Sequence, residues 1–415
     1  MGKITTVSPF APEKLARLPA IDGVRFATAE AGIRYKDRTD LMVAVMEPGT
    51  VAAGVLTQSK TCSAPVLLCR ENLAKGKARI LVVNSGNANA FTGMKGREAV
   101  EATVAAAAAA AGCKPNKVYV SSTGVIGEPM DVTKFTPMLA ELAKKAKANA
   151  FEDAARAIMT TDTYPKVATR KVDLDGVKVT INGFCKGAGM IAPDMATMLC
   201  YIFTDAAISH KLLQNLVSEH AETTFNCMTV DGDTSTSDTC LAFATGTAAK
   251  RGQEPINKKS DKRLAVFGAA FHSLMRDLAI QVAKDGEGLS KFVTFEITGA
   301  ESFKAARTIA RACANSPILK AAIAGEDPNW GRVVMAVGKS GEAADRDKLT
   351  IWFGEHCVAR NGERAEEYVE ATVAAYMKNR EILIRADVGV GKASATVWTC
   401  DLTHDYISIN ADYRS

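Results

Sequence analysis

The chain has 415 residues, of which 47% are hydrophobic and 23% are charged, a balance typical of a globular protein with a full core and not of a disordered or fibrous chain. The formal net charge of +5 is small for this length, and an aromatic content of 6% offers few rings for stacking on bases, so nucleic-acid binding is not expected. The length is sufficient for two or three domains.

The first half of the chain alternates short apolar runs with glycine-rich turns and alanine-rich stretches. Ala-rich composition predicts a helix over 97–112, which Gly112 ends, and a second helix over 134–159. Apolar runs rich in branched residues, and in one case strict alternation, predict strands. The predicted strands cover residues 43–55, 79–83, 117–121 and 171–181.

The second half begins with a strand predicted from Thr197 to Phe203, followed by helices over 209–226 and 261–284. The basic stretch 250–263 between those helices is expected to be a solvated loop. Apolar Val293, Phe295 and Ile297 alternate with polar residues and predict a half-buried strand. From there helices and strands alternate, and we expect a smaller C-terminal α/β domain over 290–400.

The ten cysteines and five histidines are scattered along the chain. They form no CxxC pair, no zinc-finger spacing and no HExxH motif, so no metal site is predicted. The N-terminal residues lack the apolar core of a signal peptide, and no run of 18 apolar residues occurs. We therefore expect a cytoplasmic enzyme without membrane contact.

One block of sequence, CKGAGMIAPDMATMLCYIFTDA (185–206), differs from its surroundings. It joins a lysine, Lys186, to flexible glycines, and Thr197 then opens an apolar run. A hydroxyl at the mouth of a buried strand beside a glycine-rich loop is one way to place a nucleophile. From spacing alone, a β-forming residue that starts a strand is the commoner explanation of Thr197.

The segment KGAGMIAPDMATML (186–199) closely resembles the cleavage-site motif of the ornithine acetyltransferase family, the glutamate N-acetyltransferases of arginine biosynthesis. Asp194 stands where many members carry Asn. The likeness continues in order along nearly the whole chain. Its other segments are VVNSGNANAFTG (82–93), SSTGVIGEP (121–129), TTDTYPK (160–166), DGDTSTSDT (231–239), KDGEG (284–288), GEDPNWGRV (325–333) and NADYRS (410–415).

The resemblance implies an α+β fold, an αββα sandwich of the DmpA and ornithine acetyltransferase type that resembles N-terminal-nucleophile hydrolases. It also implies that the precursor cuts itself between Ala196 and Thr197, leaving an α chain of residues 1–196 and a β chain of residues 197–415. Two copies of each are expected to assemble. Thr197 would then supply both the hydroxyl nucleophile and an α-amino base, whose reference pKa is about 7.7–8.0.

In that family the threonine takes acetyl from N-acetylornithine and passes it to glutamate, and no cofactor is needed. Bifunctional members also accept acetyl-CoA as donor, which the sequence does not decide. The charges suit such substrates, with Lys186 for an α-carboxylate and Glu287 for a δ-ammonium. The implied oxyanion residues are Thr123 and Gly124. The implied substrate-binding residues are Thr163, Lys186, Thr197, Glu287, Asn410 and Ser415.

Each implied residue also has a simpler explanation, such as an ordinary turn for Thr123 and Gly124. Two competing functions remain at this point. One is a self-processing aminopeptidase or amidase of the same fold, in which water replaces glutamate; such relatives typically use serine at the cut. The other is an inactive amino-acid-binding protein, which the presence of every implied site residue disfavours.

Overall fold

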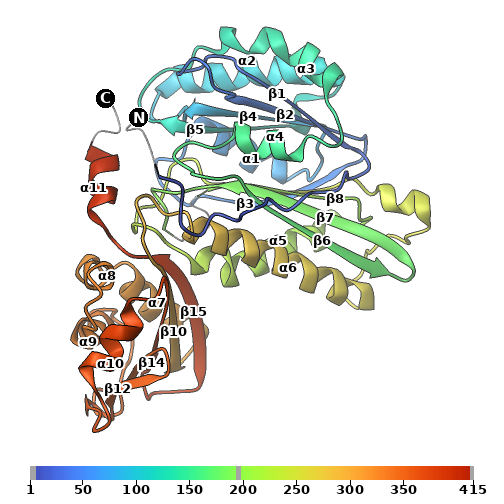
Figure 1. Cartoon of the computed structure of the whole chain (residues 1–415). Coiled ribbons are helices and arrows are strands. Elements are labelled where there is room, and N and C mark those ends of the chain that lie inside the picture. The colour runs from blue at the N-terminus through green and yellow to red at the C-terminus, as the bar shows by residue number, and fades with distance from the viewer. Residues whose placement is uncertain (1–5, 193–197, 412–415) are drawn as a thin grey trace.

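Four layers form the main body of the molecule: helices, a four-stranded sheet, a five-stranded sheet and helices again (Figure 1). The computed structural model describes residues 6–192 and 198–411. A second, smaller lobe, formed by the C-terminal part of the chain, lies on the side of the helices that cover the five-stranded sheet (Figure 1). The four layers confirm the predicted αββα sandwich.

The four-stranded sheet contains β1 (Val24–Ala29), β2 (Leu41–Met46), β4 (Ile80–Asn87) and β5 (Val118–Val125), in the order β1-β2-β4-β5. β4 and β5 are parallel, and the other pairs are antiparallel. Every residue of β2 is buried, because alternate side chains enter two different cores. Leu41 and Val43 pack under α2 (Gly93–Ala111) and α3 (Leu139–Lys145), whereas Met42 and Ala44 face the second sheet.

The five-stranded sheet has the order β3-β9-β8-β7-β6. Its strands are β3 (Val51–Leu56), β9 (Thr239–Ala244), β8 (Leu199–Thr204), β7 (Val177–Lys186) and β6 (Lys166–Leu174). α5 (His210–Thr223) and α6 (Lys262–Ala283) cover its outer face (Figure 1). None of the helices among the described residues is long and apolar enough to cross a membrane.

An aromatic core holds the two sheets together. Phe26 of β1 lies 5.1 Å, centroid to centroid, from Phe203 of β8, in an edge-to-face arrangement. Phe203 stacks in turn on Phe243 of β9 at 5.3 Å. α4 (Phe151–Ala157) enters the same core through Phe151, and α1 (Ala64–Leu73) packs on β5 and β3. Burying these large rings fixes how the sheets face each other, and therefore where their strand ends meet.

The C-terminal lobe is a six-stranded sheet, β13-β12-β11-β14-β10-β15, covered by helices. In β10 Val293, Phe295 and Ile297 are buried and the intervening side chains are half-buried, as the alternation predicted. The strands are β10 (Phe292–Ala300), β11 (Thr350–Phe353), β12 (His356–Arg360), β13 (Glu363–Arg364), β14 (Glu381–Asp387) and β15 (Ala393–Cys400). The helices are α7 (Phe303–Ala314), α8 (Pro317–Ala324), α9 (Trp330–Gly338), α10 (Glu370–Met377) and, leaving the lobe, α11 (His404–Ala411).

Two of the predicted strands were wrong, because each is in fact a pair of strands. The segment 43–55 turns at residues 47–50, so that β2 and β3 belong to different sheets. The segment 171–181 contains a hairpin between β6 and β7. Its turn is Asp175-Gly176, with φ of +56° and +87°, an Asp-Gly pair typical of a tight hairpin.

The continuous helix predicted over 134–159 was also wrong. Helical structure breaks between α3 and α4, where Lys147 forms an isolated bridge with Phe26 of β1. The Lys147 N–H donates to the Phe26 carbonyl at 2.8 Å, and the Phe26 N–H donates back at 2.9 Å. Tertiary pairing with the sheet edge thus overrides the helix propensity of the Ala- and Lys-rich segment.

Candidate active site

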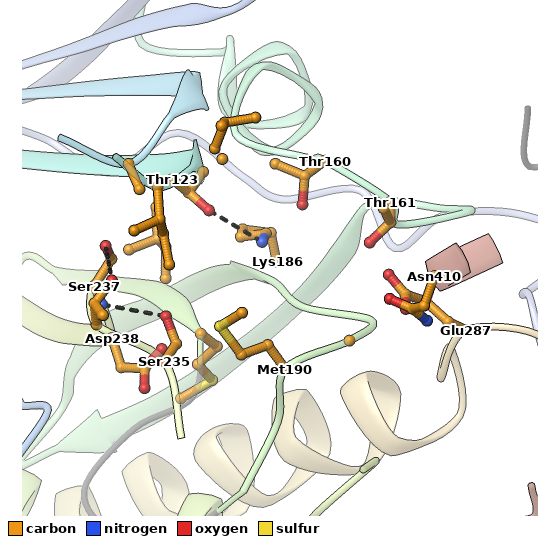
Figure 2. Close-up of a pocket in the computed structure, with 18 residues that line it drawn as sticks. Thr123, Thr160, Thr161, Lys186, Met190, Ser235, Ser237, Asp238, Glu287 and Asn410 are labelled. Carbon is orange, nitrogen blue, oxygen red and sulfur yellow. Dashed lines mark hydrogen bonds between the residues drawn. The ribbon is translucent and has the colours of Figure 1, made fainter. Parts of the chain in front are cut away.

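A cavity of about 280 Å³ lies where the ends of β5 and β7 meet the starts of β8 and β9. Both sheets contribute to its wall, together with the turn after α6 and with α11 (Figure 2). Its lining residues are Ala88, Thr123, Gly124, Val125, Ile126, Thr160, Thr161, Lys186, Gly189, Met190, Met198, Leu199, Ser235, Thr236, Ser237, Asp238, Glu287 and Asn410.

One corner of the cavity is formed by Thr123 and Gly124 at the end of β5. Gly124 has a φ of +129° and pairs with Gly86 of β4 so closely that a Cβ would lie 2.3 Å from the Gly86 carbonyl carbon. Only glycine fits there. The Thr123 hydroxyl oxygen accepts a hydrogen bond from Lys186 Nζ at 3.3 Å, which leaves its own O–H to donate. This corner therefore offers a donor to a developing negative charge.

The cavity also carries a cation and a carboxylate at separate points of its wall (Figure 2). Lys186 ends β7, and burial lowers the pKa of its ammonium although Asp162 opposes this. Glu287 follows α6, and burial raises the pKa of its carboxyl, against hydrogen bonds from Thr161 and Asn410. Asn410 Nδ2 donates to Glu287 Oε2 at 2.8 Å. Both charges are poorly solvated, so each can bind a ligand group of opposite charge strongly.

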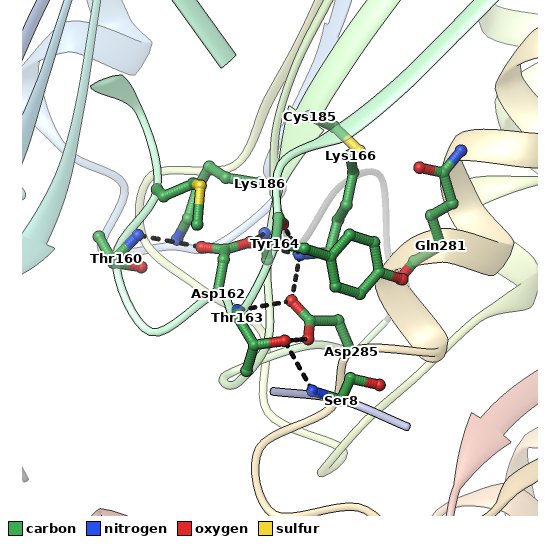
Figure 3. A network of polar contacts seen from close by, with 12 residues as sticks. Ser8, Thr160, Asp162, Thr163, Tyr164, Lys166, Cys185, Lys186, Gln281 and Asp285 are labelled. Carbon is green, nitrogen blue, oxygen red and sulfur yellow. Dashed lines mark hydrogen bonds and ion pairs between the residues drawn. The ribbon is translucent and has the colours of Figure 1, made fainter. Parts of the chain in front are cut away.

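A buried network supports the cavity wall from behind (Figure 3). Lys166 Nζ lies 2.7 Å from Asp162 Oδ1 and 2.6 Å from Asp285 Oδ2, and all three side chains are inaccessible to solvent. Asp162 also accepts hydrogen bonds from the backbone N–H groups of Gly187, at 2.6 Å, and Thr160, at 3.0 Å. Asp162 thereby ties the turn beside Lys186 to the loop that provides Thr160.

Thr163 belongs to this network and does not line the cavity. Its backbone N–H donates to Asp285 Oδ2 at 2.9 Å, and its hydroxyl donates to the same carboxylate. The Ser8 backbone N–H in turn donates to Thr163 Oγ1 at 3.0 Å (Figure 3). The cavity wall in this segment is formed by Thr160 and Thr161. A contact between Thr163 and substrate stays a prediction.

Three of the implied site residues, Ala196, Thr197 and Ser415, lie outside the described residues. Met198, which follows the segment 193–197, lines the cavity, and so does Met190, three residues before that segment. Asp231 holds the chain in place at Met190 by accepting hydrogen bonds from the backbone N–H groups of Met190, at 2.7 Å, and Ile191, at 2.8 Å. Met198, the residue that follows the implied nucleophile in the sequence, is thus part of the cavity wall.

Sequence reasoning missed several polar residues of the cavity, namely Thr161, Ser235, Ser237 and Asp238. They stand in the segments TTDTYPK and DGDTSTSDT, which the resemblance had singled out without assigning them a role. A cluster of polar residues next to an apolar strand was the feature of the sequence that could have indicated them. No group of three or more potential metal ligands comes together among the described residues.

These features define a class of protein: an αββα sandwich with a charged cavity at the start of a central strand, and this cavity has the size of a small zwitterion. The profile of the ArgJ family matches residues 25–415. The arginine biosynthesis bifunctional protein ArgJ of Mesorhizobium japonicum is 59% identical over 411 residues, covering 99% of this chain and 100% of that protein. The chain belongs to the ArgJ family.

Two solved structures are also similar to this chain. The arginine biosynthesis bifunctional protein ArgJ from Bacillus halodurans is 36% identical and covers 52% of this chain and 99% of its own, with a TM-score of 0.49. The ornithine acetyltransferase from Mycobacterium tuberculosis, in complex with ornithine, is 34% identical and covers 43% of this chain and 94% of its own, with a TM-score of 0.38.

Proposed function

We propose that this protein is a self-cleaving acetyltransferase of arginine biosynthesis, a glutamate N-acetyltransferase that moves acetyl from N-acetylornithine to glutamate. Cleavage between Ala196 and Thr197 frees the Thr197 amino group. The Thr197 hydroxyl then attacks the acetyl carbonyl of N-acetylornithine, and ornithine leaves. The amine of glutamate attacks the resulting ester, and N-acetylglutamate leaves with Thr197 restored.

The observation that carries this proposal is the charge pattern of the cavity. Lys186 and Glu287 are buried, oppositely charged, and line the same cavity. N-Acetylornithine carries one carboxylate and one ammonium, and these two residues match them. The donor corner at Thr123 and Gly124 suits the oxyanion of the tetrahedral intermediate, which forms at the end of the cavity next to Met198.

A two-substrate assay tests the proposal. Purified protein is incubated with N-acetylornithine and isotopically labelled glutamate, and the products are followed by mass spectrometry. We expect labelled N-acetylglutamate, and a peptide beginning at Thr197 that gains one acetyl group when glutamate is omitted. Release of free acetate with no transfer to glutamate would indicate an amidase instead. Absence of any acetylated Thr197 peptide would reject the covalent route.

Gly189→Ala is expected to weaken substrate binding. A Cβ at this position would lie 2.3 Å from Glu287 Oε2, so the carboxylate must move away from the site where it meets an ammonium. A charge-assisted hydrogen bond contributes about 1.5–3 kcal/mol, so we expect KM for N-acetylornithine to rise roughly 10–100-fold. Gly338→Ala is the control, because nothing lies within 4 Å of a Cβ there. Equal KM values for the two variants in steady-state kinetics would contradict the role of Glu287.

The relative from Mesorhizobium japonicum is named a bifunctional protein, which supports acetyl-CoA as a second acetyl donor. We include that activity in the proposal, with acetyl-CoA as a substrate and no bound cofactor. An assembly of two α and two β chains follows from the family resemblance, and a cytoplasmic location follows from the composition; both stay predictions.

A further inference from the structure

Glu287 lines a part of the cavity wall that has to meet opposite charges in the two proposed substrates. In N-acetylornithine and in glutamate, the α-carbon carries the α-carboxylate and the nitrogen that exchanges the acetyl group. The third carbon beyond the α-carbon bears an ammonium in N-acetylornithine and is itself the carboxylate carbon in glutamate. With the shared groups bound alike, the δ-ammonium of one substrate and the γ-carboxylate of the other reach the same place.

The Glu287 carboxylate is held at one end of the cavity, near Thr161, Gly189 and Asn410 (Figure 2). The residue is 8% exposed, and its backbone N–H donates to the Ala188 carbonyl at 2.9 Å. A Cβ on Gly189, which also lines the cavity, would lie 2.3 Å from Glu287 Oε2 and 2.7 Å from Oε1. The charged group itself, and not only the stem of the side chain, therefore lies against a residue of the cavity wall.

The hydrogen-bond donors that contact Glu287 are already in use. Asn410 Nδ2 donates one N–H to Glu287 Oε2 at 2.8 Å and the other to the Tyr406 carbonyl at 3.0 Å. The Thr161 hydroxyl also donates to the Glu287 carboxylate. With Glu287 ionised, neither Asn410 nor Thr161 has a donor left for the γ-carboxylate of glutamate.

The charges around Glu287 favour uptake of a proton when a second carboxylate arrives. Burial raises the pKa of the Glu287 carboxyl against its two hydrogen bonds, and the charge of Asp231 adds to the rise, whereas Lys186 opposes it. The Tyr406 hydroxyl of α11 stays neutral near pH 7, because burial and the carboxylates of Asp231 and Glu287 raise its pKa. Two carboxylates that share one site do not both remain ionised, and a shared proton replaces their repulsion by a hydrogen bond.

We propose that Glu287 recognises the two substrates in two protonation states. Ionised, it pairs with the δ-ammonium of N-acetylornithine; protonated, it donates its O–H to the γ-carboxylate of glutamate. The proton comes from the solvent when glutamate binds, forming an O–H bond on Glu287, and it returns to the solvent before the next N-acetylornithine binds. This inference rests on the proposed function, because it requires both substrates in one cavity.

Two ligands that cannot react isolate the binding step. 5-Aminopentanoate keeps the carboxylate and the ammonium of ornithine, glutarate keeps both carboxylates of glutamate, and neither has the α-amino group. Carboxyl groups in water titrate near pH ~4 and alkyl ammonium groups near pH ~10, so both ligands keep their charges between about pH 6.5 and 8.5. Calorimetric titration of the purified protein in buffers of different ionisation enthalpy measures the protons taken up with each ligand.

We expect glutarate and 5-aminopentanoate to differ by about one proton per molecule bound. Glutarate takes up the proton that an ionised Glu287 lacks, and 5-aminopentanoate releases the proton that a neutral Glu287 holds. The affinity for glutarate should therefore fall as the pH rises through the raised pKa of Glu287, by up to about tenfold per pH unit, and that for 5-aminopentanoate should fall as the pH drops through it. Equal proton uptake with the two ligands would overturn the proposal, and so would failure of either ligand to bind.

Glu287→Gln fixes the site in the state proposed for glutamate, since the amide donates N–H and carries no charge. We expect glutarate to bind this variant without proton uptake and with an affinity that no longer changes with pH, and 5-aminopentanoate to bind roughly 10–100-fold more weakly than to the wild type. Glu301→Gln is the control and should match the wild type, because Glu301 is exposed in the C-terminal lobe and does not line the cavity. Unchanged proton uptake with glutarate in Glu287→Gln would assign the proton to another group and overturn the proposal.

These binding measurements do not depend on acetyl transfer. If Glu287→Gln does not fold, the difference in proton uptake between the two ligands in the wild type decides the proposal by itself. A wild-type protein that makes no N-acetylglutamate would overturn the proposed function. Active transfer combined with equal proton uptake for the two ligands would leave the proposed function standing and overturn the two-state role of Glu287.

Discussion

Thr197→Ala is expected to leave the chain of 415 residues uncut and to lower acetyl transfer by roughly 10⁴–10⁶-fold. The variant removes the hydroxyl that attacks the Ala196 carbonyl during maturation and the acetyl group during turnover. Without cleavage, the α-amino base is not formed either. A histidine could replace that base, but the described cavity wall contains no histidine. Denaturing mass spectrometry reports cleavage, and the glutamate assay reports transfer.

Thr197→Ser is the matched control for that experiment. Serine keeps a hydroxyl and, after cleavage, an amino group, so we expect two chains and a measurable part of the acetyl transfer. An alanine variant that is cut before residue 197 would show that another group performs the cleavage. An uncut alanine variant with full transfer activity would remove Thr197 from the mechanism altogether.

The sequence predicted those parts of the fold that are determined by residues close to one another along the chain. The helix that ends at Gly112 is an example, because Gly112 adopts a left-handed φ of +57° that closes α2. The strand over residues 293–297 is another, since its alternation reflects burial of one face. Residues 146–150 could not be predicted in this way. Lys147 leaves the helix to pair with Phe26, more than a hundred residues earlier in the chain.

The candidate site likewise contains residues that the sequence indicated and residues that only the structure shows. The resemblance identified Thr123, Lys186, Glu287 and Asn410, and the structure brings all four to one cavity. Neither spacing nor composition indicated that Asp238 would border the same space. Its place depends on the parallel pairing of β8 with β9, a contact between segments about forty residues apart.

The buried network also required the structure, because the pairing of Lys166 with Asp285 joins β6 to the end of α6. Burial alone would raise the pKa of Asp162, but Lys166 and Lys186 outweigh it and hold the pKa well below the usual range. Asp285 has fewer such partners, and burial raises the pKa of its carboxyl. The Lys166 ammonium therefore pairs with two carboxylates of unequal basicity, and Lys186 adds positive charge near Asp162.

Lys166→Met is expected to lower the free energy of unfolding by about 3–5 kcal/mol, because it leaves the carboxylates of Asp162 and Asp285 buried without their cation. Urea-induced unfolding of the mature protein, followed by circular dichroism, measures the change. Lys178→Met is the control. Lys178 forms an exposed pair with Asp173 at 2.8 Å, with 77% of its side chain accessible, and its loss should cost less than about 1 kcal/mol.

The pH dependence of this loss of unfolding free energy in Lys166→Met, called the deficit below, separates a charge effect from a packing effect. In the variant, the unpaired carboxylates have folded-state pKa values above the unfolded value of about 3.9, so the folded state binds protons more readily than the unfolded chain. Its stability therefore rises as the pH falls. In the wild type, the lowered pKa of Asp162 contributes stability above pH ~4 that is lost as the pH falls through the folded-state value. The deficit should thus be largest near neutral pH and shrink toward pH 5. A deficit that is constant with pH, or no larger than that of Lys178→Met, would contradict a charge-based role for Lys166.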